Sequence, residues 1–428
     1  MENNLIFKRD IEEKMLKWME RREAYAIKGP RQSGKTTLLK ILENILKSKG
    51  VNTVFLNFED PDILEAFEAN PKAYIKSFLL KEGKYCFLMD EYHYVKDPGK
   101  KLKLLYDTFE NVKFIVSGSS SLEISGAMAK FLVGRIFFFE LFPFSFHEFL
   151  AAKNFRLTKI YEENNKSLKE FLQTGEIEIK KDIFFKEFSS FFEEYIIFGG
   201  YPAVIKAEDF ETKRMILKNI YDTYISKDVV EFLKITDALK YRRVVRTLAA
   251  LMGNLINYNE ICSICQTYYK ELKRIISILS ETYIVDLIQP FYVNPITELR
   301  KAPKLYFFDL GLRNYVIDNF NSLEKRTDAE ALIENFVFLN LKNNFQEALI
   351  NYWRTIAGAE VDFIVRIKDE IIPVEVKYQS FKFPKISRSL RSFIKSYKVK
   401  KALIITKDFF EQMKINDAII LFIPAYYL

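Results

Sequence analysis

Residues 29–36 read Gly-Pro-Arg-Gln-Ser-Gly-Lys-Thr, and this stretch constrains the fold more than any other part of the chain. It matches the pattern G-x-x-x-x-G-K-[ST], in which a glycine-rich loop between a strand and a helix cradles phosphate groups. Residues 23–28 are mostly apolar, as a buried strand would be, and residues 36–46 carry apolar side chains at helical spacing. The sequence therefore predicts an α/β fold with a strand, loop and helix unit that binds phosphates.

Each residue type in this loop has a chemical role. Gly29 and Gly34 let the backbone point its N–H groups at phosphate oxygens. Lys35 can reach the β- and γ-phosphates as a point charge, and Thr36 offers a hydroxyl to Mg²⁺ at the positive end of a helix. We expect the phosphates to be bound by one contiguous set of residues: Gly29, Pro30, Arg31, Gln32, Ser33, Gly34, Lys35, Thr36 and Thr37.

Two acids follow the apolar residues 85–89. In P-loop nucleotide hydrolases, an acid after such a strand holds Mg²⁺, and a neighbouring residue orients the attacking water. We therefore predict Asp90 as a Mg²⁺ and nucleotide ligand and Glu91 as a catalytic residue. A strand that ends in a solvated acidic turn is the alternative, but the phosphate loop upstream favours the catalytic interpretation.

A third candidate strand, residues 112–117, runs into a Gly-Ser-Ser-Ser segment. Ser117 and Ser119 are candidates to sense the γ-phosphate or to orient water, and a plain Ser/Gly turn is the alternative. Arg135 has two interpretations as well. It is either an arginine finger toward the γ-phosphate of its own or a neighbouring subunit, or a structural residue paired with a surface acid.

The order of these segments resembles the archaeal and bacterial AAA+ ATPases, with an AAA_14-type domain, that carry a DUF4143-type C-terminal region. Members of that family often have Gln two residues after the acidic pair, where this chain has His93, and we assign His93 no catalytic role. The resemblance implies an ATP-binding switch or motor with a parallel P-loop sheet. It spans nearly the whole chain and rests on these segments: Gly29-Pro30-Arg31, Gly34-Lys35-Thr36, Asp90-Glu91, residues 118–121, Gly134-Arg135, residues 141–149, residues 199–202 and residues 304–309.

Residues 237–292 read as three short helices followed by a hairpin formed by residues 283–288 and 291–293, which indicates a winged helix. Duplex DNA binding through phosphates is one role, and packing or protein contact is the other. The cations and aromatics of the expected recognition helix are Tyr268, Tyr269, Lys270, Lys273 and Arg274.

The C-terminal part resembles a PD-(D/E)xK nuclease core. Glu375 and Lys377 lie on one face of a predicted strand, with Asp362 at the end of its neighbour and Glu334 on a preceding helix. Three carboxylates around a point would bind Mg²⁺ and activate water, with Lys377 stabilising charge. Asp362 and Glu375 are the expected metal ligands, and an inactive binding module is the alternative. Residues 380–401 are basic and contain no acid, which suits a phosphate backbone.

These segments predict four parts: a P-loop AAA+ ATPase domain (1–152), a helical lid or linker (153–235), a winged-helix domain (236–300) and a restriction-endonuclease-like α/β domain (301–428). The net charge of +8 permits DNA as a partner without requiring it. A protein partner and an oligomer remain open. Three cysteines suggest a reducing compartment, and neither a membrane span nor a signal peptide is apparent, so we expect a soluble cytoplasmic protein.

Overall fold

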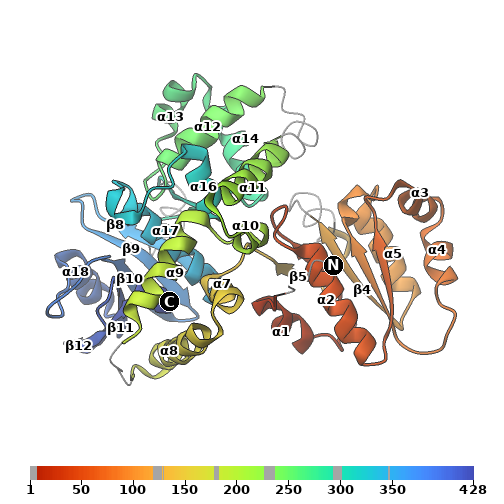
Figure 1. Ribbon diagram of the computed structural model, residues 1–428, viewed down its shortest axis with the longest axis horizontal. Coiled ribbons are helices and arrows are strands. Elements are labelled where there is room, and N and C mark those ends of the chain that lie inside the picture. The colour runs from red at the N-terminus through yellow and green to blue at the C-terminus, as the bar shows by residue number, and fades with distance from the viewer. Residues whose placement is uncertain are drawn as a thin grey trace. The chain divides into compact units, whose positions relative to one another are not determined.

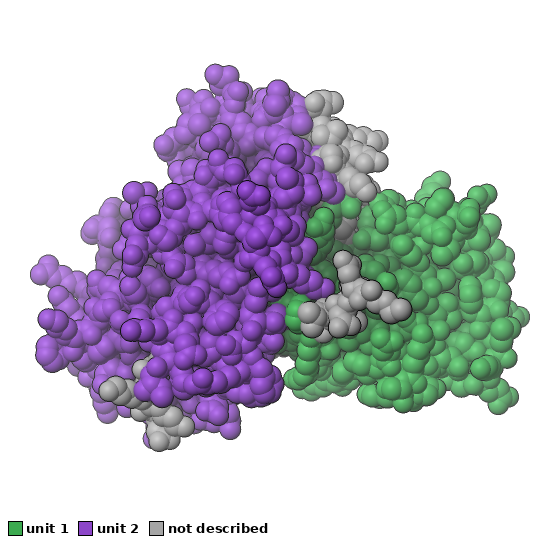
Figure 2. Space-filling view, viewed as in Figure 1, with its two compact units in different colours: residues 1–144, 281–284 green, residues 145–280, 285–428 purple. Residues whose placement is uncertain are grey.

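The computed structural model describes residues 7–118, 128, 130–177, 183–225, 237–292, 301–345 and 348–428. The chain forms two compact units, coloured separately in Figure 2. Unit 1 comprises Met1–Phe144 with Glu281–Ile284, and unit 2 comprises Ser145–Ser280 with Val285–Leu428. The predicted site residue Ser119 lies outside the described residues.

Unit 1 is built on five parallel strands in the order β2-β3-β4-β1-β5. This arrangement confirms the predicted parallel α/β sheet. Figure 1 labels β4 and β5 of this sheet. The described elements are α1 (Asp10–Lys17), β1 (Ala24–Lys28), α2 (Lys35–Ser48), β2 (Asn52–Asn57), α3 (Pro61–Ala69), α4 (Pro71–Ser77), β3 (Tyr85–Asp90), η1 (Tyr92–Tyr94), α5 (Pro98–Thr108), β4 (Val112–Gly118) and β5 (Ile136–Glu140).

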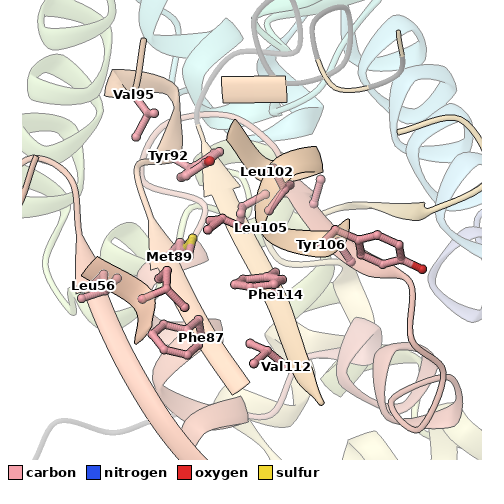
Figure 3. Close-up of a cluster of buried hydrophobic side chains, with 14 of the residues drawn as sticks. Leu56, Phe87, Met89, Tyr92, Val95, Leu102, Leu105, Tyr106, Val112 and Phe114 are labelled. Carbon is pink, nitrogen blue, oxygen red and sulfur yellow. The ribbon is translucent and has the colours of Figure 1, made fainter. Parts of the chain in front are cut away.

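Both faces of this sheet are covered by helices. Successive residues of a strand point to opposite sides, so neighbouring residues of β1 belong to different buried clusters. Tyr25 and Ile27 of β1 join a buried cluster with residues of α1 and α2. Ala24 and Ala26 join a second cluster that includes side chains of α3, α4 and α5. Figure 3 shows part of this second cluster. The continuous apolar runs of β1, β3 and β4 are thus explained by burial on two sides.

Unit 2 contains helices and a six-stranded sheet in the order β12-β13-β11-β10-β9-β8. Its described elements are α7 (Phe146–Lys153), α8 (Phe155–Thr174), α9 (Phe185–Phe198), α10 (Pro202–Lys206), α11 (Phe210–Thr223), α12 (Ala238–Ala250), α13 (Tyr258–Cys265), α14 (Tyr269–Glu281, whose last residue belongs to unit 1), β6 (Val285–Ile288), β7 (Lys304–Phe307), α16 (Leu310–Ile317), η3 (Leu323–Lys325), α17 (Ala329–Asn344), β8 (Leu349–Arg354), β9 (Glu360–Ile367), β10 (Glu370–Val376), α18 (Arg388–Tyr397), β11 (Lys401–Thr406), β12 (Glu411–Ile415), β13 (Ala418–Pro424) and η4 (Ala425–Tyr427).

In the six-stranded sheet, β8, β9 and β10 are antiparallel neighbours, and β11 is parallel to β10. Helices α17 and α18 cover opposite faces. Phe363 of β9 stacks on Phe338 of α17, whereas the next residue, Ile364, lies in a cluster with Phe393 of α18. The sheet and these two helices place the acids predicted as a metal site.

The predicted hairpin of residues 283–288 with residues 291–293 is wrong in its second strand as far as that strand is described, and Val293 lies outside the described residues. β6 pairs with β7, so residues 285–288 lie against residues 304–307. Phe291 instead donates its N–H to the carbonyl oxygen of Tyr352, at 2.5 Å. A tight hairpin after β6 would need turn residues such as Asn-Gly, and Gln289-Pro290 does not supply them. The winged helix and the four domain boundaries stay predictions.

Candidate functional site

The phosphate loop joins the end of β1 to the start of α2. Gly29 has no room for a side chain, because a Cβ there would lie 2.1 Å from the carbonyl oxygen of Leu141. Gly34 is the N-cap of α2 and has a φ of 98°, in the left-handed region that favours glycine. Gln32 also has a positive φ, of 60°. Both glycines of the motif are therefore required by the backbone.

Lys35 points its side chain back into the loop. The residue is only 5% exposed, and its Nζ donates to the carbonyl oxygens of Gly29, at 3.0 Å, and Pro30, at 2.8 Å. A buried ammonium needs such partners, because desolvation without hydrogen bonds is costly. The loop thus holds the predicted phosphate-binding cation at its own centre.

Asp90, Glu91 and Ser117 meet at the same edge of the sheet as the loop. β4 lies between β1 and β3, so Ser117 near its end is beside both the loop strand and Asp90. The Ser117 hydroxyl donates to the Asp90 carboxylate and accepts the N–H of Glu91 at 3.3 Å. Ser117, which the sequence offered together with Ser119, therefore orients the acidic pair.

Glu91 contacts His93, and its surroundings favour the carboxylate form. Its backbone is left-handed, with a φ of 51°, and His93 Nδ1 lies 3.1 Å from its Oε2. Burial opposes ionisation, but the His93 contact and the charges of Lys35 and Arg31 outweigh it and lower the pKa of Glu91. A carboxylate kept ionised beside the loop lysine can polarise water. Sequence reasoning assigned His93 no role, and the structure places it against Glu91.

Arg9 is a further residue that sequence reasoning missed. It is 5% exposed, and its guanidinium donates to the carbonyl oxygens of Ser33, at 2.9 Å, and Phe142, at 2.8 Å. The same group lies 4.4 Å from the centre of the Phe144 ring. Arg9 thereby ties the phosphate loop to the segment after β5. Its position before the motif gave no local signal of this contact.

Arg135 lies away from this edge. It immediately precedes β5, its carbonyl oxygen accepts the N–H of Ala24 at the start of β1, and the loop follows the other end of β1. Its Nη1 is 2.6 Å from Asp107 Oδ1. This geometry does not support a finger toward the loop of the same subunit and matches the surface-pair interpretation. A role toward a neighbouring subunit stays a prediction.

Thr36 and Thr37 lie in the first turn of α2, and both are exposed. Their hydroxyls are oxygen donors of the kind that Mg²⁺ prefers, as is the carboxylate of Asp90. These residues fit a Mg²⁺ ion accompanying the nucleotide. Their roles as ligands stay predictions.

Gly29→Ala is expected to weaken nucleotide binding at least tenfold, because the added methyl must displace the loop or the Leu141 carbonyl. The measurement is a titration with a fluorescent ATP analogue. Gly50→Ala is the control, since its φ of 76° strains an alanine while nothing lies within 4 Å. It should lower the melting temperature slightly, at a cost of about 1 kcal/mol, and leave affinity unchanged. Equal affinity for both variants would contradict the steric argument.

A second group of predicted residues meets in unit 2. Glu334 lies on α17, Asp362 near the start of β9, and Glu375 near the end of β10. Asp362 accepts the N–H of Val376 at 2.7 Å, which links β9 to β10. Lys377 follows β10, and its Nζ lies 3.4 Å from Glu375 Oε1. The structure therefore brings the predicted Glu375–Lys377 pair together.

Lys304, to which the sequence assigned no role, is inserted among these acids. Its Nζ lies 3.0 Å from Glu334 and 2.6 Å from Glu360, and the residue is 3% exposed. The Tyr306 hydroxyl donates to the same Glu334 oxygen at 2.5 Å. The only sequence signal was their place in the segment 304–309 that carries the family resemblance. A lysine ammonium thus neutralises the acid expected from the helix.

Burial sets the protonation of this cluster. It raises the pKa of Glu334 to about 7, although Lys304 acts in the opposite direction. Burial also raises the pKa of Asp362, although Lys304 lowers it. It raises the pKa of Glu375 as well, and there Lys377 is the main group that lowers it. Each raised pKa means that the folded chain favours the neutral acid more than a solvated carboxyl would.

The expectation of three carboxylates around one metal ion is not met. Across the described ranges, no three His, Cys, Asp or Glu side chains are grouped so that they could hold a metal. The physical reason is Lys304, which supplies positive charge at Glu334 and Glu360. Asp362 and Glu375 as a two-acid Mg²⁺ site, and Lys377 as their catalytic partner, stay predictions.

Two predicted basic surfaces have different outcomes. Lys401, the last cation of the basic stretch, is buried and pairs with Glu370 at 3.0 Å, so it is not available to a phosphate backbone. It lies on β11, where its stem is part of the core. The residues of the expected recognition helix are exposed at the start of α14 or just before it: Tyr268, Tyr269, Lys270, Lys273 and Arg274.

Three family models match separate parts of the chain. Residues 21–150 match an AAA domain, residues 189–323 a domain of unknown function (DUF8612) and residues 329–428 a domain of unknown function (DUF4143). An uncharacterized protein of Haemophilus influenzae is 24% identical over 412 residues, covering 94% of this chain and 93% of the relative. An uncharacterized protein of Methanocaldococcus jannaschii is 26% identical, covering 84% and 75%.

Solved structures give only weak overall likeness. AMPPCP-bound DnaA from Aquifex aeolicus is 14% identical with a TM-score of 0.30, covering 63% of this chain and 86% of that one. The PCH-2 structure from C. elegans is 14% identical with a TM-score of 0.23, covering 62% and 65%. Scores this low carry no argument on fold or function.

The AAA domain match and the loop geometry agree on the first part of the chain. Residues 21–150 match an AAA domain and carry a phosphate loop at the end of a parallel sheet, and residues 329–428 match the DUF4143 model. These findings support nucleotide binding. Within the described residues, no helix combines the length and the apolar character needed to cross a bilayer.

Proposed function

We propose that this chain is an ATP hydrolase whose nucleotide cycle controls a DNA-associated C-terminal region. The observation that carries the first half is the arrangement at the end of the sheet, where Lys35 is held inside the loop and Ser117 bonds to Asp90 and to the N–H of Glu91. The lowered pKa of Glu91, to which the charge of Lys35 contributes, agrees with it. A cation for the phosphates and a base for water meet at the end of one sheet. That is the minimal equipment for phosphoryl transfer to water, which depends on positioning and electrostatics.

Each residue has one task in this proposal. Backbone N–H groups of residues 29 and 31–36 would bind the phosphates, and Lys35 would exchange its carbonyl partners for phosphate oxygens. Glu91 would orient and deprotonate the water, kept ionised by His93 and by the nearby cations. Thr36 and Asp90 would hold Mg²⁺, which supplies charge neutralisation when it is bound with ATP. Arg135 would act only from a neighbouring subunit.

The DNA half of the proposal rests on exposed cations in unit 2 and on the acids of the C-terminal sheet. One observation favours the alternative, in which the nuclease-like domain binds DNA or a protein partner without cutting. Lys304 compensates Glu334 and Glu360 internally. We therefore propose that the domain containing Asp362, Glu375 and Lys377 binds DNA or a protein partner and does not cut DNA efficiently.

One assay tests both halves. The purified chain is incubated with ATP and Mg²⁺ or Mn²⁺, alone and with single-stranded, duplex or branched DNA. We expect ATP turnover that DNA stimulates, and intact DNA on the gel. Absence of turnover under every condition would contradict the first half, and indifference to every DNA would contradict the second.

Glu375→Ala and Glu375→Ala/Lys377→Ala are the matched variants for this assay. If the domain only binds, neither change introduces or removes cleavage, and DNA-free ATP turnover stays at the level of the unmodified chain. Nicking by the unmodified chain that disappears in Glu375→Ala would contradict the non-cleaving proposal. It would instead assign Asp362 and Glu375 as metal ligands and Lys377 as a catalytic residue.

A further inference from the structure

Helix α18 presents a stripe of cations to solvent. They recur at intervals of three and four residues, so they share one side of the helix. All are exposed, and within the described part of the chain none of them forms an ion pair. Exposed serines lie beside them at positions 392 and 396. The stripe consists of Arg388, Arg391 and Lys395, with Lys398 at the C-cap.

The opposite side of α18 fixes this orientation. Leu390, Phe393 and Ile394 are buried against the sheet, and the Phe393 ring meets Trp353 edge-on with centroids 5.2 Å apart. The apolar side of the helix is therefore already used within the domain. A membrane-surface helix would need that side for the lipid, so the stripe fits a phosphate polymer better than a bilayer.

The stripe begins beside Glu375, one of the acids of the C-terminal sheet. Ser387, the N-cap of α18, donates its hydroxyl to Glu375 Oε2 at 2.9 Å and accepts the N–H of Leu390 at 3.0 Å. Lys377 contacts the same Glu375 carboxylate. A strand bound along α18 would therefore lead to the Glu375–Lys377 pair.

The segment just before α18 adds an aromatic side chain. Phe383 is 79% exposed and stands in the sequence between the exposed cations Lys382 and Lys385. An isolated exposed phenylalanine is unfavourable in water, and its ring offers a face on which a base can stack. Cations that follow a backbone, combined with an aromatic platform, are the pattern of single-strand binding.

We propose that α18 and the preceding segment bind single-stranded nucleic acid, with the stripe on its phosphates and Phe383 under a base. This inference rests on the proposed DNA association and names its surface and its ligand. It places the contact with nucleic acid on α18 in unit 2. It requires neither binding by α14 nor any change in the ATP site.

The test is fluorescence anisotropy of a labelled single-stranded oligonucleotide at several salt concentrations. Arg391→Glu/Lys395→Glu is expected to weaken binding at least tenfold and to reduce the slope of log affinity against log salt by about 1.4, at roughly 0.7 per lost phosphate contact. Phe383→Ala is expected to weaken binding about fivefold or more with an unchanged slope, because it removes only stacking. Lys166→Glu/Lys169→Glu on α8 is the control, with the same change in net charge and exposed positions.

Each of the other possible outcomes would contradict a specific part of the proposal. Thermal melts and DNA-free ATP turnover should match the unmodified chain in all variants. If the α18 variant binds normally while Lys273→Glu/Arg274→Glu does not, this surface is wrong and DNA association stands. If the unmodified chain hydrolyses ATP but binds no oligonucleotide, both the surface and the DNA half of the proposed function fail. Tighter binding to duplex DNA or to phosphatidylserine vesicles would overturn the single-strand assignment.

Discussion

Lys35→Ala is expected to abolish measurable ATP binding, lowering affinity by about a hundredfold or more, or roughly 3 kcal/mol. The ammonium is buried and hydrogen-bonded to Gly29 and Pro30, so it is already held where phosphates would lie. Its loss removes the central positive charge of the loop and leaves two carbonyl oxygens to repel the nucleotide. Isothermal titration calorimetry with ATP and Mg²⁺ measures the effect.

Two companion variants separate this effect from a general loss of structure. Lys40→Ala removes an exposed lysine from the same helix and should leave ATP affinity unchanged. Glu91→Gln should bind ATP at least as well as the unmodified chain, because it removes a negative charge near the phosphates, while turnover falls by a hundredfold or more. Unchanged affinity in Lys35→Ala would contradict the assignment of this loop as the nucleotide site.

The phosphate site could be predicted because its determinants are contiguous. The order of strand, glycine loop and helix is written in residues 23–46, and the two glycines occupy the positions where the backbone demands them. Asp90 and Glu91 end an apolar strand, which places them at the same edge of any parallel sheet that contains β1. Local sequence and elementary sheet geometry are sufficient here.

The contacts that complete the site are distant in the sequence. Arg9 reaches the Phe142 carbonyl across 133 positions, and Ser117 reaches Asp90 across 27. Nothing in the neighbourhood of Arg9 marks it as a brace for the loop. The location of Arg135 could not be read from its neighbours in the sequence either. Its position at the end of the sheet opposite the loop follows only from the register of β5 against β1.

Pairing over long connections was the main limit in unit 2. The predicted acids Glu334, Asp362 and Glu375 were found from their own strands and helix, but Lys304 enters from a strand that pairs with β6. The hairpin prediction assigned that pairing to residues 291–293 because they are nearer in the sequence. Local sequence pattern cannot show that β6 pairs with the more distant strand β7 and not with the nearer residues 291–293. Because β7 was missed as the partner, the position of Lys304 beside the acids was missed as well.

Lys304→Met is therefore expected to destabilise unit 2 by about 3–5 kcal/mol, the cost of leaving one side of a buried ion pair uncompensated. Glu334 and Glu360 lose their shared cation, and methionine conserves most of the volume. The deficit should shrink as pH falls from about 8 to about 6. Lys304 lowers the pKa of Glu334, which is already about 7, so its loss raises that pKa further. Between pH 8 and pH 6 the folded variant therefore gains more from the protonation of Glu334 than the folded unmodified chain does.

Tryptophan fluorescence can isolate this effect. The chain has two tryptophans, so a Trp18→Phe background leaves Trp353 on β8 as the reporter of unit 2 during urea unfolding. Lys342→Met is the control, because its pair with Asp286 is more exposed and should contribute less than about 1 kcal/mol. In Lys304→Met/Glu334→Gln one of the abandoned charges is gone, so part of the loss should be recovered. A Lys304→Met chain as stable at pH 8 as the control would show that Lys304 does not compensate the acids, and the case against metal-dependent cleavage would lose its physical basis.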